Sequence, residues 1–521
     1  MSEVDGRSLE RAGRDAHASA DYATATTSYE AAFAAYRTEG DLGAAARAAR
    51  TVAWFRGWVF GDWAVHRGWI ARARRLLEHA DDAHGRGWVV LDDALGGNDL
   101  EVQRAQYLEA IGIARRMGDL DLECDATASL GMMLVFSGQT EQGLTHLDEA
   151  LAAICGGDVS ELPVVEGCLC GLVTACERVR DVARAEQWLR AAREVMQRKN
   201  LLAVAGHCRA HYAGLLIAAG RWADADDELI SALDLLPHGI AAHASARCRL
   251  ADLRVRQGQF EAAEQLLVGL DHHPDAVVPL AAVFLATSRH DLAAELLDRA
   301  QDSNVHDDHG IVPLLALSVE VHVASGDWER ARNSRDRLVA FANAQPTTYG
   351  AAMAAVACAR LCSALGDADA SIHWHRAVTG FASAHLPAET AVARVGLARA
   401  IARDRRAAAI AELEAAHATF EDLGARRDAD RAAALLRQLG GRHTTGPKRL
   451  AQLTRREDEV LELIALGLSN AQIGERLFIS AKTAEHHVGR ILAKHGLRSR
   501  AEAAARLNRA GQAGGAGSML K

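Results

Sequence analysis

The sequence predicts an all-α protein in which a long α-solenoid of helical hairpins is followed by a small four-helix domain. Hydrophobic residues make up 49% of the 521 residues, whereas aromatic residues make up 5% and Pro occurs 8 times. Helix-forming residues are therefore abundant and strand-forming residues scarce. The two parts of the chain also differ in charge. From residue 446 onward there are 13 Lys and Arg and 7 Asp and Glu, a net charge of +6, whereas the preceding 445 residues carry a net charge of −15. This division indicates a basic module suited to nucleic acid after an acidic body.

Turns recur through the acidic body at nearly constant spacing. Gly220 lies 38 residues before Gly258, and Gly326 lies 40 residues before Gly366. In such a turn the Gly ends one helix in the left-handed region, and a following polar residue begins the next. A period of roughly 34 to 41 residues is typical of stacked helical hairpins, which bury their apolar faces only against their neighbours. We expect about ten or eleven hairpins to fill residues 10–440.

The turns Gly220 to Ala225 and Gly326 to Ala331 share the pattern Gly-x-aromatic-x-x-Ala before an apolar helix. These units resemble tetratricopeptide repeats, most closely over residues 200–340. The resemblance implies that the array binds a protein, a peptide or a small effector and performs no chemistry of its own. We expect the turn aromatics Trp222, Phe260 and Trp328 to pack between the two helices of a hairpin.

Five of the nine tryptophans lie between Trp54 and Trp88. This density could line an apolar effector pocket. The alternative, that these rings form the core of an N-terminal repeat, is the one we favour.

A polar run rich in Gly separates the acidic body from the basic module. We expect a repeat array over residues 1–440, a flexible linker over 441–449, a DNA-binding domain over 450–509 and a disordered tail over 510–521.

Helix signals are dense in the basic module. Thr454 with Glu457, and Ser469 with Gln472, form two capping boxes, and Ser480 can cap a third helix. The apolar positions expected to share one core are Val460, Leu461, Ile464, Ile473, Leu477, Ala484, Val488, Ile491 and Leu492. Three helices that meet at one core, with a short turn between the second and third, form a helix-turn-helix unit.

The motifs Leu-Thr-x-Arg-Glu from Leu453, Gly-Leu-Ser-Asn from Gly467 and Ile-Ser-x-Lys-Thr from Ile479 resemble the LuxR-type helix-turn-helix domain, which is also the output domain of NarL-type response regulators. The resemblance implies a bacterial, cytoplasmic transcription regulator that binds double-stranded DNA. Helix 481–495 would enter the major groove, and a fourth helix, 500–507, would pair two copies as a homodimer on DNA.

The residues expected to contact DNA are Thr454, Ser469, Asn470, Lys482, Thr483, Glu485, His486, Gly489, Arg490 and Lys494. By resemblance, Glu485, His486 and Gly489 occupy base-reading positions, where related output domains often carry a Lys or another long side chain, so the base readout is expected to differ here. We interpret Lys482, Arg490 and Lys494 as phosphate contacts. The alternative for this set is an ordinary solvated helix face. We expect His487 to point to the core as a packed, hydrogen-bonded residue.

Motifs that the sequence lacks exclude some kinds of regulation. The chain has no Gly-Lys pair and therefore no P-loop, so it resembles the repeat and DNA-binding halves of MalT-like regulators without their nucleotide switch. A single Lys in the first 445 residues argues against a phosphoacceptor receiver. We expect no enzyme activity, no cofactor, no metal and no membrane span. The alternative function is a helical-repeat scaffold for protein assembly with a secondary DNA-binding module.

Overall fold

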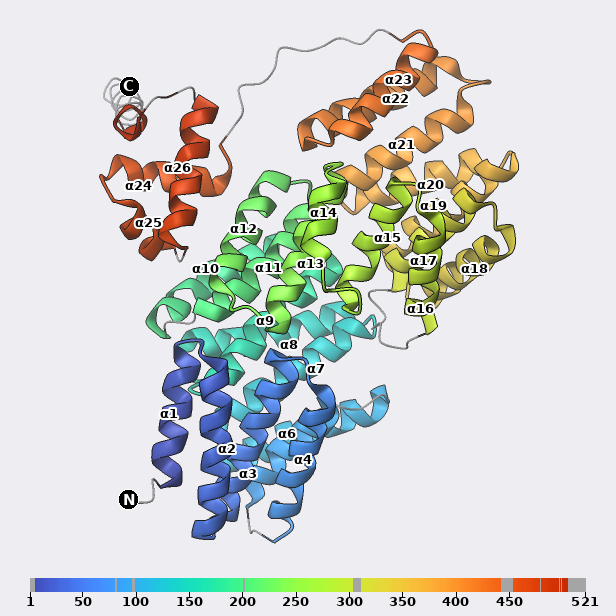
Figure 1. Ribbon diagram of the computed structural model, residues 1–521. Coiled ribbons are helices and arrows are strands. Elements are labelled where there is room, and N and C mark those ends of the chain that lie inside the picture. The colour runs from blue at the N-terminus through green and yellow to red at the C-terminus, as the bar shows by residue number, and fades with distance from the viewer. Residues whose placement is uncertain are drawn as a thin grey trace, which may run out of the picture. The chain divides into compact units, whose positions relative to one another are not determined.

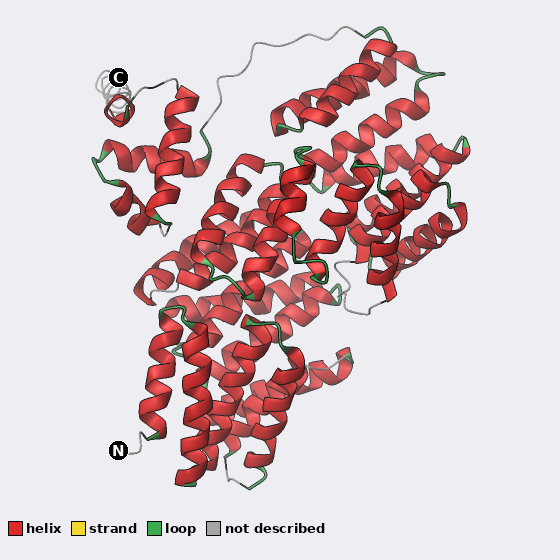
Figure 2. Cartoon of the chain, viewed as in Figure 1, coloured by secondary structure: helices red, strands yellow, loops and turns green. Residues whose placement is uncertain are grey.

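The computed structural model of the protein describes residues 5–79, 82–95, 99–199, 202–302, 311–441, 453–477, 479–495, 497 and 499–504. Every regular element within these residues is a helix (Figure 2). The predicted all-α fold is therefore confirmed. The predicted linker and tail lie almost wholly outside the described residues, so the domain boundaries stay predictions.

Within the described residues, helix follows helix along the array (Figure 1). The first are α1 (Gly6–Ala18), α2 (Tyr22–Glu39), α3 (Leu42–Trp54), the π-helix η1 (Phe55–Val59), α4 (Trp63–Leu77), α5 (Ala83–Leu95), α6 (Leu100–Met117), α7 (Leu120–Phe136), α8 (Thr140–Gly156), α9 (Leu162–Val179), α10 (Val182–Lys199) and α11 (Leu202–Ala218). They are followed by α12 (Trp222–Leu235), α13 (Ala241–Arg256), α14 (Phe260–Leu267), the 3-10 helix η2 (Pro274–Ala276), α15 (Val277–Ala286), α16 (His290–Asp302), α17 (Ile311–Ser325), α18 (Trp328–Ala344), α19 (Thr348–Leu365), α20 (Ala370–Ser383), α21 (Pro387–Ile401), α22 (Arg406–Leu423) and α23 (Arg426–Gln438).

The chain forms two compact units, one of residues 1–215 with 236–245 and one of residues 216–235 with 246–521. In the first unit, helices adjacent in sequence pack together, as α1 does on α2 and α7 on α8. The α7–α8 pair is very close, because a Cβ added to Gly143 would lie 2.5 Å from the carbonyl oxygen of Gly131. Only glycine permits this backbone approach.

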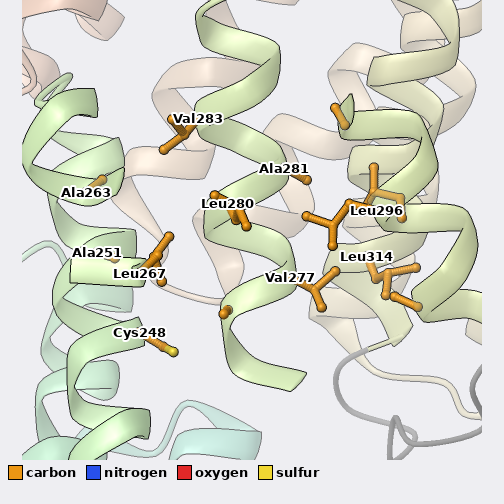
Figure 3. Close-up of a cluster of buried hydrophobic side chains, with 14 of the residues drawn as sticks. Cys248, Ala251, Ala263, Leu267, Val277, Leu280, Ala281, Val283, Leu296 and Leu314 are labelled. Carbon is orange, nitrogen blue, oxygen red and sulfur yellow. The ribbon is translucent and has the colours of Figure 1, made fainter. Parts of the chain in front are cut away.

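The second unit repeats the same hairpin packing in its array, where α17 packs on α18, α19 on α20 and α21 on α22. Figure 3 shows part of its core, in which Leu280 and Val277 of α15 lie between Leu267 of α14 and Leu296 of α16. Each helix is therefore covered by the next, as expected of a repeat array.

The turn glycines behave as predicted. Gly220, Gly258, Gly326 and Gly366 all have φ between +73° and +78°, the left-handed region that ends a helix at little cost only for glycine. Glycine therefore marks these four turns, whereas Arg180 and Ser288, with φ of 61° and 62°, occupy the same position at two other turns.

The aromatic residues of these turns behave unequally. Trp222 is 4% exposed, and its Nε1 donates to the carbonyl oxygen of Ile217 at 3.0 Å. Phe260 is partly buried. Trp328, in contrast, is 37% exposed, so it is covered less completely than the expectation of inter-helix packing implies. Trp328 is the first residue of α18.

The N-terminal tryptophans are likewise mixed. Trp88 is buried, with the Arg50 guanidinium 3.7 Å from its ring centroid. Trp58, on the π-helix, and Trp63 are exposed and contact each other edge to face. The core interpretation therefore holds for Trp88 but not for this exposed pair.

One described helix, Thr348–Leu365, is long and apolar enough to cross a membrane by length and composition, with a mean hydropathy of 1.3. Its residues contribute to two buried clusters, against α20 and against α17 and α18. Packing between neighbouring helices gives a sufficient reason for its apolar character.

Candidate nucleic-acid interface

Three helices build the C-terminal domain: α24 (Arg455–Ala465), α25 (Asn470–Leu477) and α26 (Ala481–His495). Both α24 and α25 pack against α26 (Figure 1). All nine apolar residues predicted to share a core belong to one hydrophobic cluster, which Ile479 and Ala503 complete. The predicted three-helix core is thus confirmed, and residues 500–504 begin a further helical segment.

The helices begin where the capping signals placed them. Thr454 Oγ1 accepts from the backbone N–H of Glu457 at 3.1 Å, and the Glu457 carboxylate accepts from the Thr454 N–H at 2.8 Å. Ser469 and Gln472 form the same reciprocal pair, at 3.3 and 2.8 Å. Ser480 Oγ accepts from the N–H of Thr483 at 3.0 Å. These caps satisfy backbone donors and fix the start of each helix.

The turn between α25 and α26 depends on a glycine that the sequence analysis did not single out. A Cβ on Gly474 would lie 2.6 Å from the carbonyl oxygen of Ile479 and 3.3 Å from the backbone nitrogen of Ala481. These neighbours are backbone atoms, which cannot move aside as a side-chain end can. Gly474 therefore sets how closely α25 approaches the start of α26.

Part of the predicted DNA-contact set on α26 is open to solvent. Lys482, Glu485, His486 and Gly489 are all exposed. A Cβ at Gly489 would meet nothing within 4 Å, so the space beside the helix is open at this position. These four residues lie on one face, as their helical spacing predicts.

Two further members of the set, Arg490 and Thr454, contact acidic side chains. Arg490 Nη1 lies 2.6 Å from Asp227 Oδ1 and 3.4 Å from Asp226 Oδ2. Thr454 Oγ1 donates to the second oxygen of Asp227 at 2.7 Å. Both carboxylates belong to α12, and Asp227 is fully buried. Burial raises the pKa of Asp227 to about 7, against the opposing effects of Arg490 and the Thr454 hydroxyl.

A second contact lies at the N-terminus of α26. Ser480 Oγ donates to Asp234 Oδ2 at 2.9 Å, and Thr483 Oγ1 donates to the same oxygen. Thr483 is 2% exposed, so this residue, expected on the outward face, is covered. Asp227 and Asp234 lie seven residues apart and therefore on the same face of α12.

The remaining site residues have partners inside the domain. Lys494 Nζ lies 2.5 Å from Glu457 Oε2, a carboxylate that is fully buried. Asn470 Oδ1 accepts from Arg500 at 2.6 Å, and Ser469 serves as the cap of α25. The Asn470–Arg500 bond joins the start of α25 to the fourth helical segment. These residues therefore have structural roles besides any contact with DNA.

His487 is on the core side, as predicted, and is 1% exposed. The expected hydrogen bond is wrong, because neither ring nitrogen has a hydrogen-bond partner among the described residues, and Asp227 Oδ1 lies 3.7 Å from Nδ1. Burial and the neighbouring Arg456 and Arg490 lower the pKa of His487 to about 3. The ring is therefore neutral at physiological pH.

No group of three or more His, Cys, Asp or Glu that could hold a metal ion occurs within the part of the chain that the structure describes. The expectation of no metal stays a prediction for the whole chain.

Comparison with known families decides what this domain is. Residues 451–507 match the model described as bacterial regulatory proteins, luxR family. The C-terminal domain is a LuxR-family helix-turn-helix domain. It is 46% identical over 66 residues to the transcriptional regulatory protein DegU of Brevibacillus brevis, and 47% identical over 60 residues to the oxygen regulatory protein NreC of Staphylococcus aureus. The matches cover 13% and 12% of this chain and 28% and 27% of those proteins, so the chain spans less than a third of the length of these relatives.

The whole chain is similar to solved helical structures at low sequence identity. The crystal structure of the APC/C hetero-tetramer Cut9–Hcn1 is 13% identical, with a TM-score of 0.40, and covers 97% of this chain and 96% of that one. Yeast Tom70 is also 13% identical, with a TM-score of 0.29, over 83% of this chain and 96% of its own.

Proposed function

We propose that the protein is a transcription regulator that reads the major groove of duplex DNA with α26, under the control of an effector or protein bound to the helical array. The observation that carries the proposal is the LuxR-family domain over residues 451–507, folded as a capped three-helix unit. The exposed face of α26 supports it, since Lys482, Glu485 and His486 are open to solvent.

Roles on α26 follow from side-chain chemistry. Lys482 and Arg490 contact phosphates, which fix the register of the helix on the duplex. Glu485 accepts a hydrogen bond from a base, and the amino group of cytosine is the donor it fits best. The open surface at Gly489 lets the helix approach the base edges closely. The remaining contacts are proposed for Thr454, Ser469, Asn470, Thr483, His486 and Lys494.

The active form on DNA is proposed to be a homodimer. Two copies related by a two-fold axis would place two α26 helices in successive turns of the major groove, on a pseudo-palindromic site. The helical segment that begins at 500–504 is the surface that the family resemblance implies for this pairing. The proposed location is the cytoplasm, and the proposed function needs neither catalysis nor a cofactor.

A genome-wide map of DNA bound by the full chain tests this function. Discrete sites that share one sequence motif support regulation. Uniform, low coverage would contradict it and favour the alternative of a helical-repeat scaffold with a secondary DNA-binding module. The matched control is Lys482→Ala, which should lower occupancy at all sites without changing the motif.

A further inference from the structure

We propose that the acidic face of α12 is a docking surface for the DNA-binding domain of the same chain, and that docking competes with DNA. The inference rests on the proposed function, because it concerns access to the same domain. The proposed docking surface on the array consists of the carboxylates Asp226, Asp227 and Asp234. Its occupant is the face of the DNA-binding domain formed by Thr454, Ser480, Thr483 and Arg490.

The composition of α12 fits this role. Its 14 residues include five carboxylates, at 224, 226, 227, 228 and 234, and no Lys or Arg. Asp227 and Asp234 stand two helical turns apart on one face. Carboxylates in a row on a helix accept hydrogen bonds from hydroxyl and guanidinium groups. In charge and in acceptor chemistry they resemble a row of phosphates.

The contacts themselves show which groups are occupied. Asp227 engages Arg490 with one oxygen and the Thr454 hydroxyl with the other, at 2.6 and 2.7 Å. Asp234 engages both hydroxyls at the start of α26, those of Ser480 and Thr483. Of the ten residues expected to contact DNA, Thr454, Thr483 and Arg490 therefore already bind a carboxyl oxygen of the array.

Docked and DNA-bound states exclude each other on these grounds. Arg490 cannot pair with Asp227 and with a phosphate in the same geometry, because Asp226 and Glu457 also lie within 4.0 Å of its guanidinium. The carboxylates of α12 would in addition repel a phosphate backbone placed beside the start of α26. The base-reading residues Glu485 and His486 stay exposed, so docking removes backbone contacts, which supply most of the affinity.

The two-state consequence is quantitative. If only a fraction of the molecules is undocked, the apparent affinity for DNA falls by that fraction. An effector that binds the array and favours the undocked state raises DNA affinity by the ratio of its affinities for the two states. Control of the DNA-binding domain therefore needs no nucleotide and no phosphoacceptor.

The test compares full-length variants for binding to a labelled duplex of random sequence at low salt. The first variant, Asp234→Ala, removes the exposed carboxylate of the docking surface. The second, Asp226→Asn/Asp227→Asn, neutralises the two buried carboxyls. We expect severalfold tighter binding for the first and about tenfold or more for the second. Hydrogen exchange without DNA should be faster at the start of α26 in both variants.

The matched control is Glu329→Gln/Glu414→Gln, which neutralises two exposed carboxylates on α18 and α22. An equal gain in DNA affinity for this control would overturn the inference, because the gain would then report net charge alone. Equal binding by the wild type and the α12 variants would also overturn it, while leaving the proposed function intact. Loss of binding in every protein, wild type included, would instead contradict the proposed function. Asp234→Ala keeps the test decisive if the buried double variant fails to fold.

Discussion

The guanidinium of Arg490 and the buried carboxylate of Asp227 lie 2.6 Å apart, although 263 residues separate them in sequence. The pair joins a helix of the array to the helix that we propose reads DNA. An arginine held in this way is not free for phosphate, whereas Lys482 on the same helix is exposed. The two basic residues should therefore respond differently to mutation.

Lys482→Ala should weaken binding of the full chain to every duplex alike and reduce the salt dependence by about 0.9 in log–log slope, the value for one lost phosphate contact. Arg490→Ala should cost less net affinity, because it removes a phosphate contact and also the Asp227 contact that holds the domain docked. Fluorescence anisotropy titrations at several salt concentrations measure both. A larger loss for Arg490→Ala than for Lys482→Ala, at an unchanged salt slope, would contradict this assignment.

His487 makes the stability of the domain sensitive to pH. Its pKa is about 3 in the folded domain, against 6.5 for an ordinary histidine. The unfolded domain therefore takes up a proton first as the pH falls, so the stabilisation from neutral His487 is complete above pH 6.5 and is lost toward pH 3. At pH 5 the loss should be about 2 kcal/mol relative to pH 7.

Hydrogen-exchange protection of the core amides of α24 and α26 measures this loss locally. His487→Leu is the control, since it keeps the site filled but cannot take up a proton. Its protection should change less between pH 7 and pH 5 than that of the wild type. The same pH dependence in both proteins would show that other groups are responsible.

Gly474 and Gly489 offer a matched pair of glycine-to-alanine changes in neighbouring helices. Gly474→Ala should destabilise the domain by about 1 to 3 kcal/mol, because its Cβ meets backbone atoms of the turn before α26. Gly489→Ala has open space and should stabilise α26 by about 0.5 to 1 kcal/mol. Thermal melting of the two variants checks the sign. Equal stability would mean that the turn is less tightly packed than the structure shows.

Trp222 and Trp328 occupy corresponding turns of the array but differ in burial. Trp222→Ala should destabilise the array by about 3 to 5 kcal/mol through lost packing and its hydrogen bond to Ile217. Trp328→Ala, at a site 37% exposed, should cost about 1 kcal/mol or less. Denaturant titrations followed by circular dichroism compare the two. Similar losses would contradict the burial difference.

Local spacing made much of this fold predictable. The caps at Thr454 and Ser469 and the nine core positions of the C-terminal domain follow from hydroxyl, carboxylate and apolar residues within a few positions of one another. The turn glycines follow equally from their own backbone requirement. Such features depend on residues close in sequence, so a pattern suffices to find them.

Contacts between distant residues could not be predicted in this way. Nothing near Arg490 or Thr483 in sequence indicates that α12 provides their partners, and the acidic character of α12 is ordinary for a solvated helix. The burial of Trp222 and exposure of Trp328 depend likewise on which helices surround each turn. Whether the His487 ring finds a hydrogen-bond partner depends on the groups that surround it, which periodicity does not determine.

Selection of binding sites from random duplexes, with the full chain, tests most directly the central claim that α26 reads DNA. The account predicts one enriched pseudo-palindromic motif, kept by Lys482→Ala and relaxed by Glu485→Ala at one base pair of each half-site, by about 1 to 3 kcal/mol. The absence of an enriched motif for both the wild type and Asp226→Asn/Asp227→Asn would contradict the claim. An unchanged motif in Glu485→Ala and His486→Ala, with a changed one in Arg490→Ala, would contradict the face of the helix assigned to the bases.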